Sequence, residues 1–166
     1  MSAYDDFFSS FRLSDGSLVN VHIMDTSGQE RYKSLNENYY KKADACLLVY
    51  DITEMKSFEE CKYYSEQMKQ RCKKGIKTIL LGNKTDLEDK RKVPSSDGVE
   101  FSQKNNYIFM ETSCLKNTNV ADAFQTLIEL TNRENIINTK NDNFNITKKS
   151  FNSKNKNNDK KRNKCF

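Results

Sequence analysis

The feature that most constrains this chain is an alternation of short apolar runs with longer helical segments after residue 42. Three runs have the composition of buried strands: Ala43–Tyr50, Lys77–Gly82 and Tyr107–Thr112. The helical segments that follow them are Ser57–Arg71, Pro94–Asn105 and 117–130. This repeated order of strand and helix predicts an α/β fold, in which a parallel sheet carries helices on its faces.

A β-hairpin is expected ahead of this region. The β-prone runs Phe7–Leu13 and Leu18–Met24 flank a short polar segment that contains Asp15-Gly16. An Asp-Gly pair between two such runs is a strong hairpin signal, so the two strands are predicted to be antiparallel.

Charge separates the body of the chain from its end. The 166 residues carry a formal net charge of +5. From residue 140 onward there are nine Lys and Arg and only two Asp, so the rest of the chain has a net charge of about −2. The same end is rich in Asn and Lys, and its few apolar residues cannot offset the cost of ordering a backbone. We predict a domain over 1–132 and a disordered tail over 133–166. Because the basic charge belongs to the tail, we expect no nucleic acid as a partner.

The cysteines and the apolar runs indicate a compartment. Five cysteines are scattered without a C-x-x-C pair, and the longest apolar run, of six residues, is far short of the roughly 20 that a membrane span needs. The first residues carry acid and resemble no secretory signal. These features favour a cytosolic protein with reduced thiols.

The loop Asp25–Glu30 follows the second hairpin strand and reads Asp-Thr-Ser-Gly-Gln-Glu. A carboxylate at a strand end can hold Mg²⁺ through water, and a glycine three residues later lets a backbone N–H approach a phosphate closely. Gln29 could then orient an attacking water. By itself, D-x-x-G is more often an ordinary strand-to-helix turn.

The loop Asn83-Lys84-Thr85-Asp86 ends the second buried strand. An Asn side chain suits the N7 and O6 edge of guanine, a carboxylate can accept from its N1–H and N2–H₂, and a Lys stem can lie under the ring. Alone, the pattern also fits a plain polar loop.

The loop Glu111–Leu115 ends the third buried strand, and its backbone N–H groups could donate to the guanine O6. Because parallel strands end at one edge of a sheet, the fold would bring these three loops together.

Together, these residues resemble the Ras superfamily of small GTPases, and the Rab branch within it. Asp25–Glu30 is similar to the family's D-T-A-G-Q-E, with Ser27 for Ala. The strings that resemble Rab rather than Ras, Rho or Arf proteins are Arg31-Tyr32, Tyr39-Tyr40 and Leu48–Thr53. Asp6-Phe7 resembles the pair that closes the first switch segment. The resemblance covers about residues 4–131.

The resemblance implies a P-loop NTPase-like fold and a GTP/GDP switch in vesicle traffic, with Mg²⁺ as the metal. Asp25 would lie near Mg²⁺, Gly28 would sense the γ-phosphate, and Gln29 would be the catalytic residue that orients water. The nucleotide-binding residues that it implies are Asp25, Thr26, Ser27, Gly28, Gln29, Asn83, Lys84, Asp86, Ser113, Cys114 and Leu115.

Two positions depart from the family pattern. Leu115 stands where a Lys usually packs on guanine, so that face of the base would be held less well. Met24 stands where Rab proteins usually carry a Trp, in an effector surface formed with Phe7 and Tyr39. Because Met is softer and more adaptable, the effector preference does not carry over.

The family's phosphate loop, G-x-x-x-x-G-K-[ST], has no match in this sequence. In the family it lies between the first strand and the first helix, ahead of every motif found here. We therefore expect a Ras-like sheet without that strand and helix, and a gap between the strands at 18–24 and 43–50. Losing four or five charge-assisted hydrogen bonds to phosphate would weaken nucleotide affinity by roughly 10⁴ or more.

Three interpretations are left open: a Rab-like switch, a pseudo-GTPase that acts as a binding module, and an incomplete gene model. For the first, the resemblance implies exchange factors, GTPase-activating proteins, escort or dissociation-inhibitor proteins and effectors as partners.

The end of the chain suggests a membrane contact. Cys165 and the cluster Lys160-Lys161-Arg162 fit a lipid anchor supported by basic charge. A CaaX box, however, needs its Cys where Asn163 stands, so an incidental Cys on a solvated tail is the alternative. A prenylated Cys165 would make the protein peripheral on the cytosolic face of an intracellular or plasma membrane.

Overall fold

The computed structural model describes residues 4–26 and 37–133, with side chains over 7–25 and 40–133. The chain divides into two units, Met1–Thr131 and Asn132–Phe166, and the elements below belong almost wholly to the first. The predicted disorder of 133–166 concerns residues that, apart from Arg133, lie outside the described ranges, so it stays a prediction.

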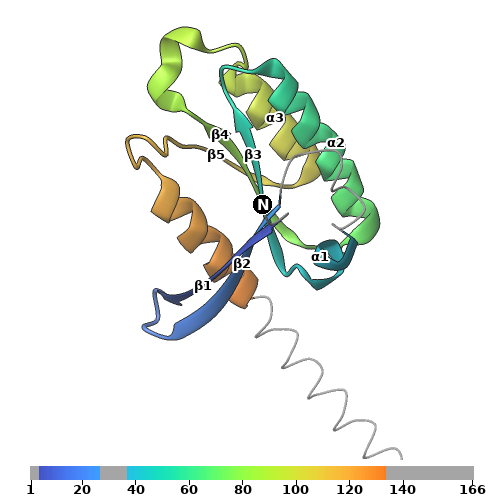
Figure 1. Cartoon of the computed structure of the whole chain (residues 1–166), viewed down its shortest axis with the longest axis vertical. Helices are drawn as coiled ribbons and strands as arrows, with labels where there is room; N and C mark the ends of the chain where they lie inside the picture. Colours follow the sequence, from blue (N-terminus) through green and yellow to red (C-terminus); the bar gives the residue numbers. More distant parts are fainter. Residues whose placement is uncertain (1–3, 27–36, 134–166) are drawn as a thin grey trace, which may run out of the picture. The chain divides into compact units, whose positions relative to one another are not determined.

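Strands and helices follow the predicted order (Figure 1). The described elements are β1 (Tyr4–Arg12), β2 (Leu18–Thr26), α1 (Glu37–Lys42), β3 (Ala45–Asp51), α2 (Met55–Arg71), β4 (Lys77–Asn83), the 3₁₀ helix η2 (Thr85–Lys90), α3 (Ser95–Asn105), β5 (Ile108–Glu111) and a last helix over 120–133. The sequence did not predict α1 or η2, because neither segment carries an apolar periodicity.

The hairpin forms as predicted. β1 pairs antiparallel with β2, with Phe7 opposite Ile23 and Arg12 opposite Leu18. Gly16 takes the positive φ of 86° that the turn requires. Contacts with the last helix hold the hairpin, since Gln125 Nε2 donates to the carbonyl oxygen of Arg12 at 2.9 Å.

The second sheet is parallel, as predicted, in the order β3-β4-β5. Over the described ranges no ladder of hydrogen bonds joins this sheet to the hairpin, and β3 is paired on one edge by β4. This separation matches the expected gap between the second hairpin strand and the next strand along the chain.

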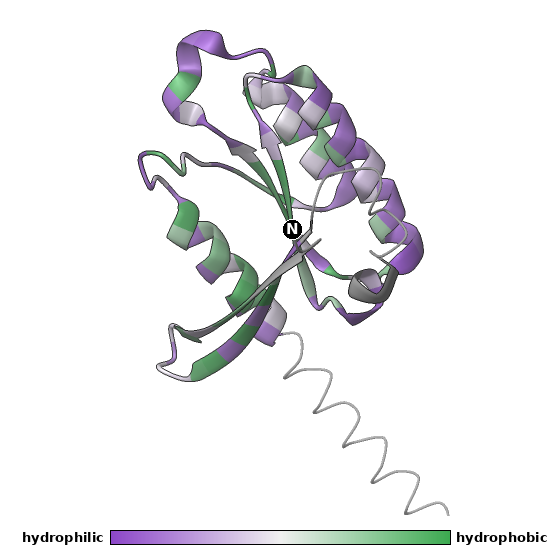
Figure 2. Ribbon diagram, viewed as in Figure 1, coloured by the Kyte–Doolittle hydropathy of each residue, from purple (hydrophilic) through white to green (hydrophobic). Residues whose placement is uncertain are grey.

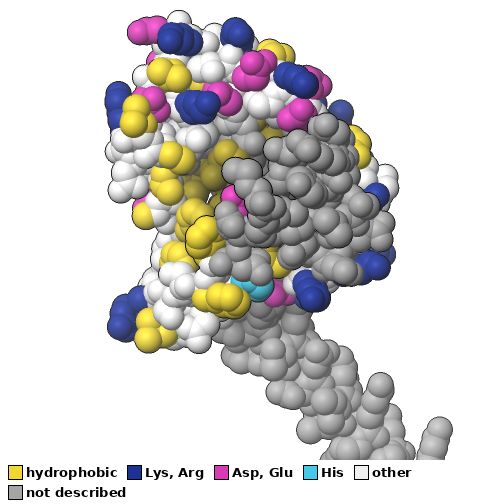
Figure 3. All heavy atoms as spheres, in the orientation of Figure 1, with side chains coloured by type: hydrophobic (Ala, Val, Ile, Leu, Met, Phe, Trp, Pro, Cys, Tyr) yellow, Lys and Arg dark blue, Asp and Glu magenta, His cyan; other side chains and the backbone are white. Residues whose placement is uncertain are grey.

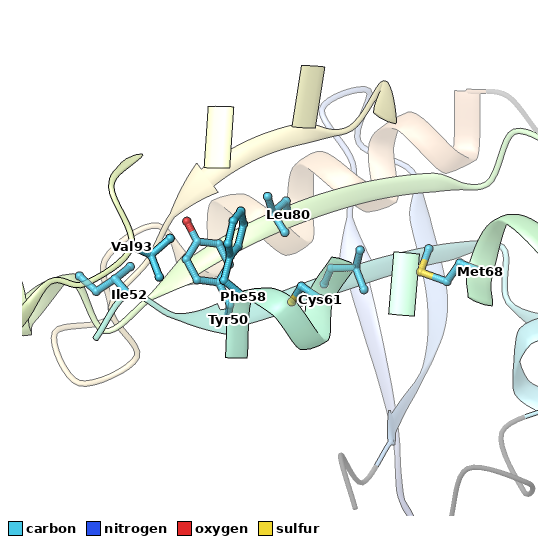
Figure 4. Close-up of a cluster of buried hydrophobic side chains, with 8 residues drawn as sticks. Tyr50, Ile52, Phe58, Cys61, Met68, Leu80 and Val93 are labelled. Atoms are coloured by element: carbon cyan, nitrogen blue, oxygen red, sulfur yellow. The ribbon is translucent and has the colours of Figure 1, made fainter. Parts of the chain in front are cut away.

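The middle strand of the parallel sheet, β4, is buried on both faces, which explains its nearly continuous apolar sequence. The flanking strands are less buried than their sequences predict, since Val49 of β3 and Ile108 of β5 are exposed. One face packs against α2 and α3 in a cluster that includes Leu48, Tyr50, Phe58 and Leu80 (Figure 4). Alternate residues face the last helix, where the cluster is Ile79, Leu81, Ala123 and Leu127. Figure 2 shows the hydrophobic colour along these strands and mostly hydrophilic colour on α2.

Two glycines allow close packing around the Tyr50 ring. A Cβ added to Gly82 or to Gly98 would lie 2.8 Å from Tyr50 Oη, and one at Gly98 would also lie 2.5 Å from the Phe109 ring. Within the described residues, Tyr50 Oη is a buried hydroxyl without a hydrogen-bond partner. Burial raises the pKa of this phenol well above its ordinary value, so the hydroxyl stays protonated.

The unpartnered hydroxyl of Tyr50 leads to a stability prediction. Burying a hydroxyl without a partner costs about 1–3 kcal/mol in proteins, so Tyr50→Phe should raise the free energy of unfolding by about 1 kcal/mol. The matched control is Tyr107→Phe, because Tyr107 Oη lies 2.8 Å from the buried Ser65 Oγ. That change should lower stability by about 1 kcal/mol. Urea unfolding followed by circular dichroism measures both, and a less stable Tyr50→Phe variant would contradict the prediction.

Candidate nucleotide-base site

The register of the parallel sheet brings two of the three predicted loops together. Gly82 of β4 is paired with Glu111 of β5, so the residues that follow each of them leave the sheet side by side. The backbone N–H of Thr112 donates to the carbonyl oxygen of Gly82 at 2.9 Å, which extends the ladder by one bond. The ends of β4 and β5 therefore form one edge, as the predicted strand order requires.

Asn83 is tied to the loop after β5 through its amide oxygen. Asn83 Oδ1 accepts from Thr112 Oγ1 at 3.2 Å and from the backbone N–H of Cys114 at 3.3 Å. These two bonds hold the amide oxygen of Asn83 against the 111–115 loop.

Asp86 is held by Ser113, which is fully buried. Ser113 Oγ donates to Asp86 Oδ1 at 2.5 Å and accepts from the backbone N–H of Lys116 at 3.1 Å. Among the described residues, no hydrogen bond reaches Asp86 Oδ2, so that oxygen is open to a donor from a ligand. The predicted meeting of Asn83, Asp86 and Ser113 at one edge is confirmed, while their contact with a base stays a prediction.

Lys84 adopts a left-handed backbone conformation, with φ 70° and ψ 36°. A residue other than glycine in this region costs about 1–3 kcal/mol, and such residues concentrate at functional sites. Its Nζ lies 2.6 Å from Asp51 Oδ2 at the end of β3. Burial pushes the pKa of Asp51 up, but hydrogen bonds from Lys84 and Thr53 outweigh burial and hold this pKa below its ordinary value.

The last two residues of the 111–115 loop are open to solvent. Cys114 is exposed, and Leu115 has 83% of its surface accessible. Leu115 directly follows Cys114, whose N–H donates to Asn83, so its exposed side chain is an apolar surface against which a planar ring could pack.

The first predicted loop is described only at its start. Asp25 is an exposed residue of β2 and lies opposite Asp5 of β1, and Thr26 ends the strand. Ser27, Gly28 and Gln29 lie outside the described residues, so the structure does not place the predicted catalytic glutamine. Over the described ranges, no cluster of three or more His, Cys, Asp or Glu could hold a metal ion.

The predicted effector surface is described in part. Phe7 is exposed and Met24 is half-buried, and the register pairs Phe7 with Ile23 and Met24 with Asp6. Strand alternation therefore turns Phe7 and Met24 to opposite faces of the hairpin. The side chain of Tyr39 lies outside the described residues, so this surface stays a prediction.

The hairpin shows a further exposed ring pair. Phe8 stacks on His22 with ring centroids 4.3 Å apart and an interplanar angle of 8°. The single histidine is visible at the molecular surface in Figure 3.

Comparison with known proteins identifies the family. A family model described as "Ras family" matches residues 3–133. The Ras-related protein Rab11D of Nicotiana tabacum is 45% identical over 123 residues, which cover 74% of this chain and 54% of that protein. RABA4b of Arabidopsis thaliana is 43% identical over 123 residues, with the same shares covered. Rab11A of Lotus japonicus is 43% identical over 126 residues, covering 76% of this chain and 55% of that protein.

These matches, together with the parallel sheet and its edge, define a Ras-like α/β protein. The chain belongs to the Ras family of small GTPases, in its Rab branch. It spans about half the length of the relatives named above. These similarities do not support the alternative interpretation as a pseudo-GTPase.

Cys114 offers a reporter for a guanine nucleotide at this edge. GDP seated against the 111–115 loop should slow alkylation of the exposed Cys114 thiol by iodoacetamide at least several-fold, because the base would cover it. Cys46 and Cys61 are internal controls, since burial raises the pKa of each thiol to about 12 and suppresses the reactive thiolate. Mass spectrometry of tryptic peptides measures the rates. Equal Cys114 rates with GDP, ADP and no nucleotide would contradict the placement.

Proposed function

We propose that this chain is a Rab-type molecular switch that recognises guanine nucleotides at the edge formed by the ends of β4 and β5. The observation that carries the proposal is the contact set of Asn83, Asp86 and Ser113 across that edge. Membership of the Ras family supports GTP and GDP as the ligands in general.

The chemistry of the donors and acceptors favours guanine over adenine. A carboxylate is acceptor-only, so Asp86 matches the adjacent N1–H and N2–H₂ donors of guanine. Adenine presents an unprotonated N1 and lacks the 2-amino group, so it would leave this carboxylate unpaired. Leaving a charged acceptor unpaired is a strong basis for rejecting a competing base.

For the phosphate half of the site we propose what the family implies. Asp25 would bind Mg²⁺ through water, Thr26, Ser27 and Gly28 would lie along the phosphates, and Gln29 would orient the water that attacks the γ-phosphate. Mg²⁺ would neutralise charge on the phosphates when bound. Lys84, Cys114 and Leu115 would contact the base from the two loops at the described edge.

We further propose a role in vesicle trafficking, with exchange factors, GTPase-activating proteins, escort or dissociation-inhibitor proteins and effectors as partners. Phe7, Met24 and Tyr39 would contribute to the effector surface, with Phe7 and Met24 contacted from opposite faces of the hairpin. The support is the similarity to Rab11 and RABA proteins.

Guanine recognition is tested with the purified chain by calorimetric titration with GDP and ADP in the presence of Mg²⁺. We expect binding of GDP and at least tenfold weaker binding of ADP. Asp86→Ala should weaken GDP binding by about 10²- to 10⁴-fold, because two charge-assisted hydrogen bonds are lost. Asp89→Ala is the matched control, since Asp89 is an exposed carboxylate in the same 3₁₀ helix, and it should change the affinity less than about twofold. Absence of GDP binding by the unmodified chain would overturn the proposal.

Membrane attachment through the tail is a separate proposal, in which Cys165 carries a prenyl group next to Lys160, Lys161 and Arg162. None of the helices that the structure describes is long and apolar enough to cross a bilayer. When the chain is expressed in eukaryotic cells, Cys165→Ser should move it from the membrane pellet to the supernatant. Asn163→Ser, two residues before Cys165 in the same tail, is the control and should leave the distribution unchanged. An equal distribution of Cys165→Ser and the unmodified chain would contradict lipidation of this cysteine.

A further inference from the structure

An ion pair between Arg91 and Glu111 joins the two segments that carry the candidate base-contacting residues. Arg91 follows η2, and Glu111 is the last residue of β5; their side chains are 15% and 27% exposed. Arg91 Nη1 donates to Glu111 Oε1 at 2.8 Å, and Nη2 donates to Oε2 at 3.3 Å. Two parallel hydrogen bonds of this kind fix the orientation of a carboxylate as well as its position.

All the donors of Arg91 are used. Besides the two bonds to Glu111, Nε and Nη2 each donate to Glu88 at 2.7 Å, and Nη1 donates to the carbonyl oxygen of Val93 at 3.1 Å. These five bonds equal the five N–H groups of a guanidinium. One side chain thus joins the end of η2, the segment before α3 and the end of β5.

Glu111 is held from a second side. Ser95 Oγ, at the first residue of α3, donates to Glu111 Oε1 at 2.6 Å. The backbone oxygen of Glu111 accepts from Asn119 Nδ2 at 2.8 Å. The carboxylate is therefore a fixed anchor at the strand end, immediately before the residues that contact Asn83 and Asp86.

The segment that carries Asp86 depends on such polar anchors. None of the residues of η2 is buried, and its backbone departs from helical angles at Leu87, with φ −104° and ψ 37°. Apolar packing therefore does not set the orientation of this segment. At its start, the backbone N–H and the hydroxyl of Thr85 both donate to the carbonyl oxygen of Thr112 at 3.1 Å.

We propose that the Arg91–Glu111 pair is a positioning element that holds the Asp86-bearing segment in register with the guanine edge. The segment is anchored at its start to Thr112 and at its end, through Arg91, to Glu111. Asp86 lies between these two anchors, so its carboxylate direction is set at both ends. The proposal rests on the proposed function, in which Asp86 accepts hydrogen bonds from the base.

The test compares Arg91→Met and Glu111→Gln with the unmodified chain. Arg91→Met keeps most of the side-chain length but removes the donors, and Glu111→Gln keeps the shape but removes the charge. Glu88→Gln is the matched control, because Glu88 contacts the same guanidinium but is 63% exposed. Thermal melting establishes whether each variant is folded. Glu111→Gln is the gentler change, and it carries the test if Arg91→Met does not fold.

The deciding readout is the ratio of the dissociation constants for IDP and GDP. The hypoxanthine base of IDP lacks the 2-amino group, so the ratio reports how well Asp86 is aimed at that group. We expect Arg91→Met and Glu111→Gln each to lower the ratio about five- to tenfold and Glu88→Gln to leave it within about twofold. The double variant should lower the ratio no further than the single variants, because both act through one contact. Equal weakening of GDP and IDP binding, with the ratio unchanged, would overturn the proposal.

A second readout needs no nucleotide and separates this proposal from the proposed function. Hydrogen exchange of the Thr85 and Cys114 amides, which bond across the two loops, should accelerate at least several-fold in both variants. Amides in the interior of β4 should exchange as in the unmodified chain. Unchanged exchange at Thr85 and Cys114 would overturn the positioning role, whereas a chain that binds no GDP would overturn the proposed function instead.

Discussion

The pairing of β4 with β5 is the constraint on which the candidate site depends. Because the two strands are parallel and Gly82 is in register with Glu111, their following loops leave the sheet at one edge. Asn83 and Asp86 on one loop then reach Thr112, Ser113 and Cys114 on the other through hydrogen bonds. A slip of one residue would turn Ile79 and Leu81 away from the last helix, so the core that buries them also fixes the site.

The site combines a rigid edge with a lightly packed segment. β4 is buried along most of its length, whereas η2 contributes no buried residue and is held by hydrogen bonds and ion pairs. A segment of this kind can adjust to a ligand at low cost, provided that its ends are anchored. Thr85 and Arg91 supply those anchors, and Lys84 is fixed from the side by Asp51.

Much of the fold could be predicted from the sequence because its signals are local. The apolar runs of β3 and β4 and the helical composition of Ser57–Arg71 identify β3, β4 and α2 to within two residues. The short segments α1 and η2 could not be predicted, because their stability comes from contacts and caps rather than from a repeated pattern. The predicted order of parallel strands was enough to predict that Asn83, Asp86 and Ser113 lie at one edge of the sheet.

Other parts of the site could not be inferred from sequence. The roles of Asp51 and Arg91 could not be predicted, because each forms an ion pair with a residue that is distant in the sequence. Asp51 pairs with Lys84, and Arg91 pairs with Glu111. The exposure of Cys114 and the positive φ of Lys84 are likewise properties of the folded loops. The resemblance supplied the family, which the comparisons confirm, whereas the roles of Gln29 and Cys165 stay predictions.

The central claim is that the loops after β4 and β5 bind one guanine base together. A ¹⁵N–¹H correlation spectrum of the labelled chain, recorded with and without GDP and Mg²⁺, tests this most directly. We expect the amide resonances of Lys84 and Asp86 and those of Ser113 and Cys114 to shift in parallel along one binding curve, while the exposed face of α2 is unaffected. Shifts in one loop without the other, or in neither, would contradict the claim.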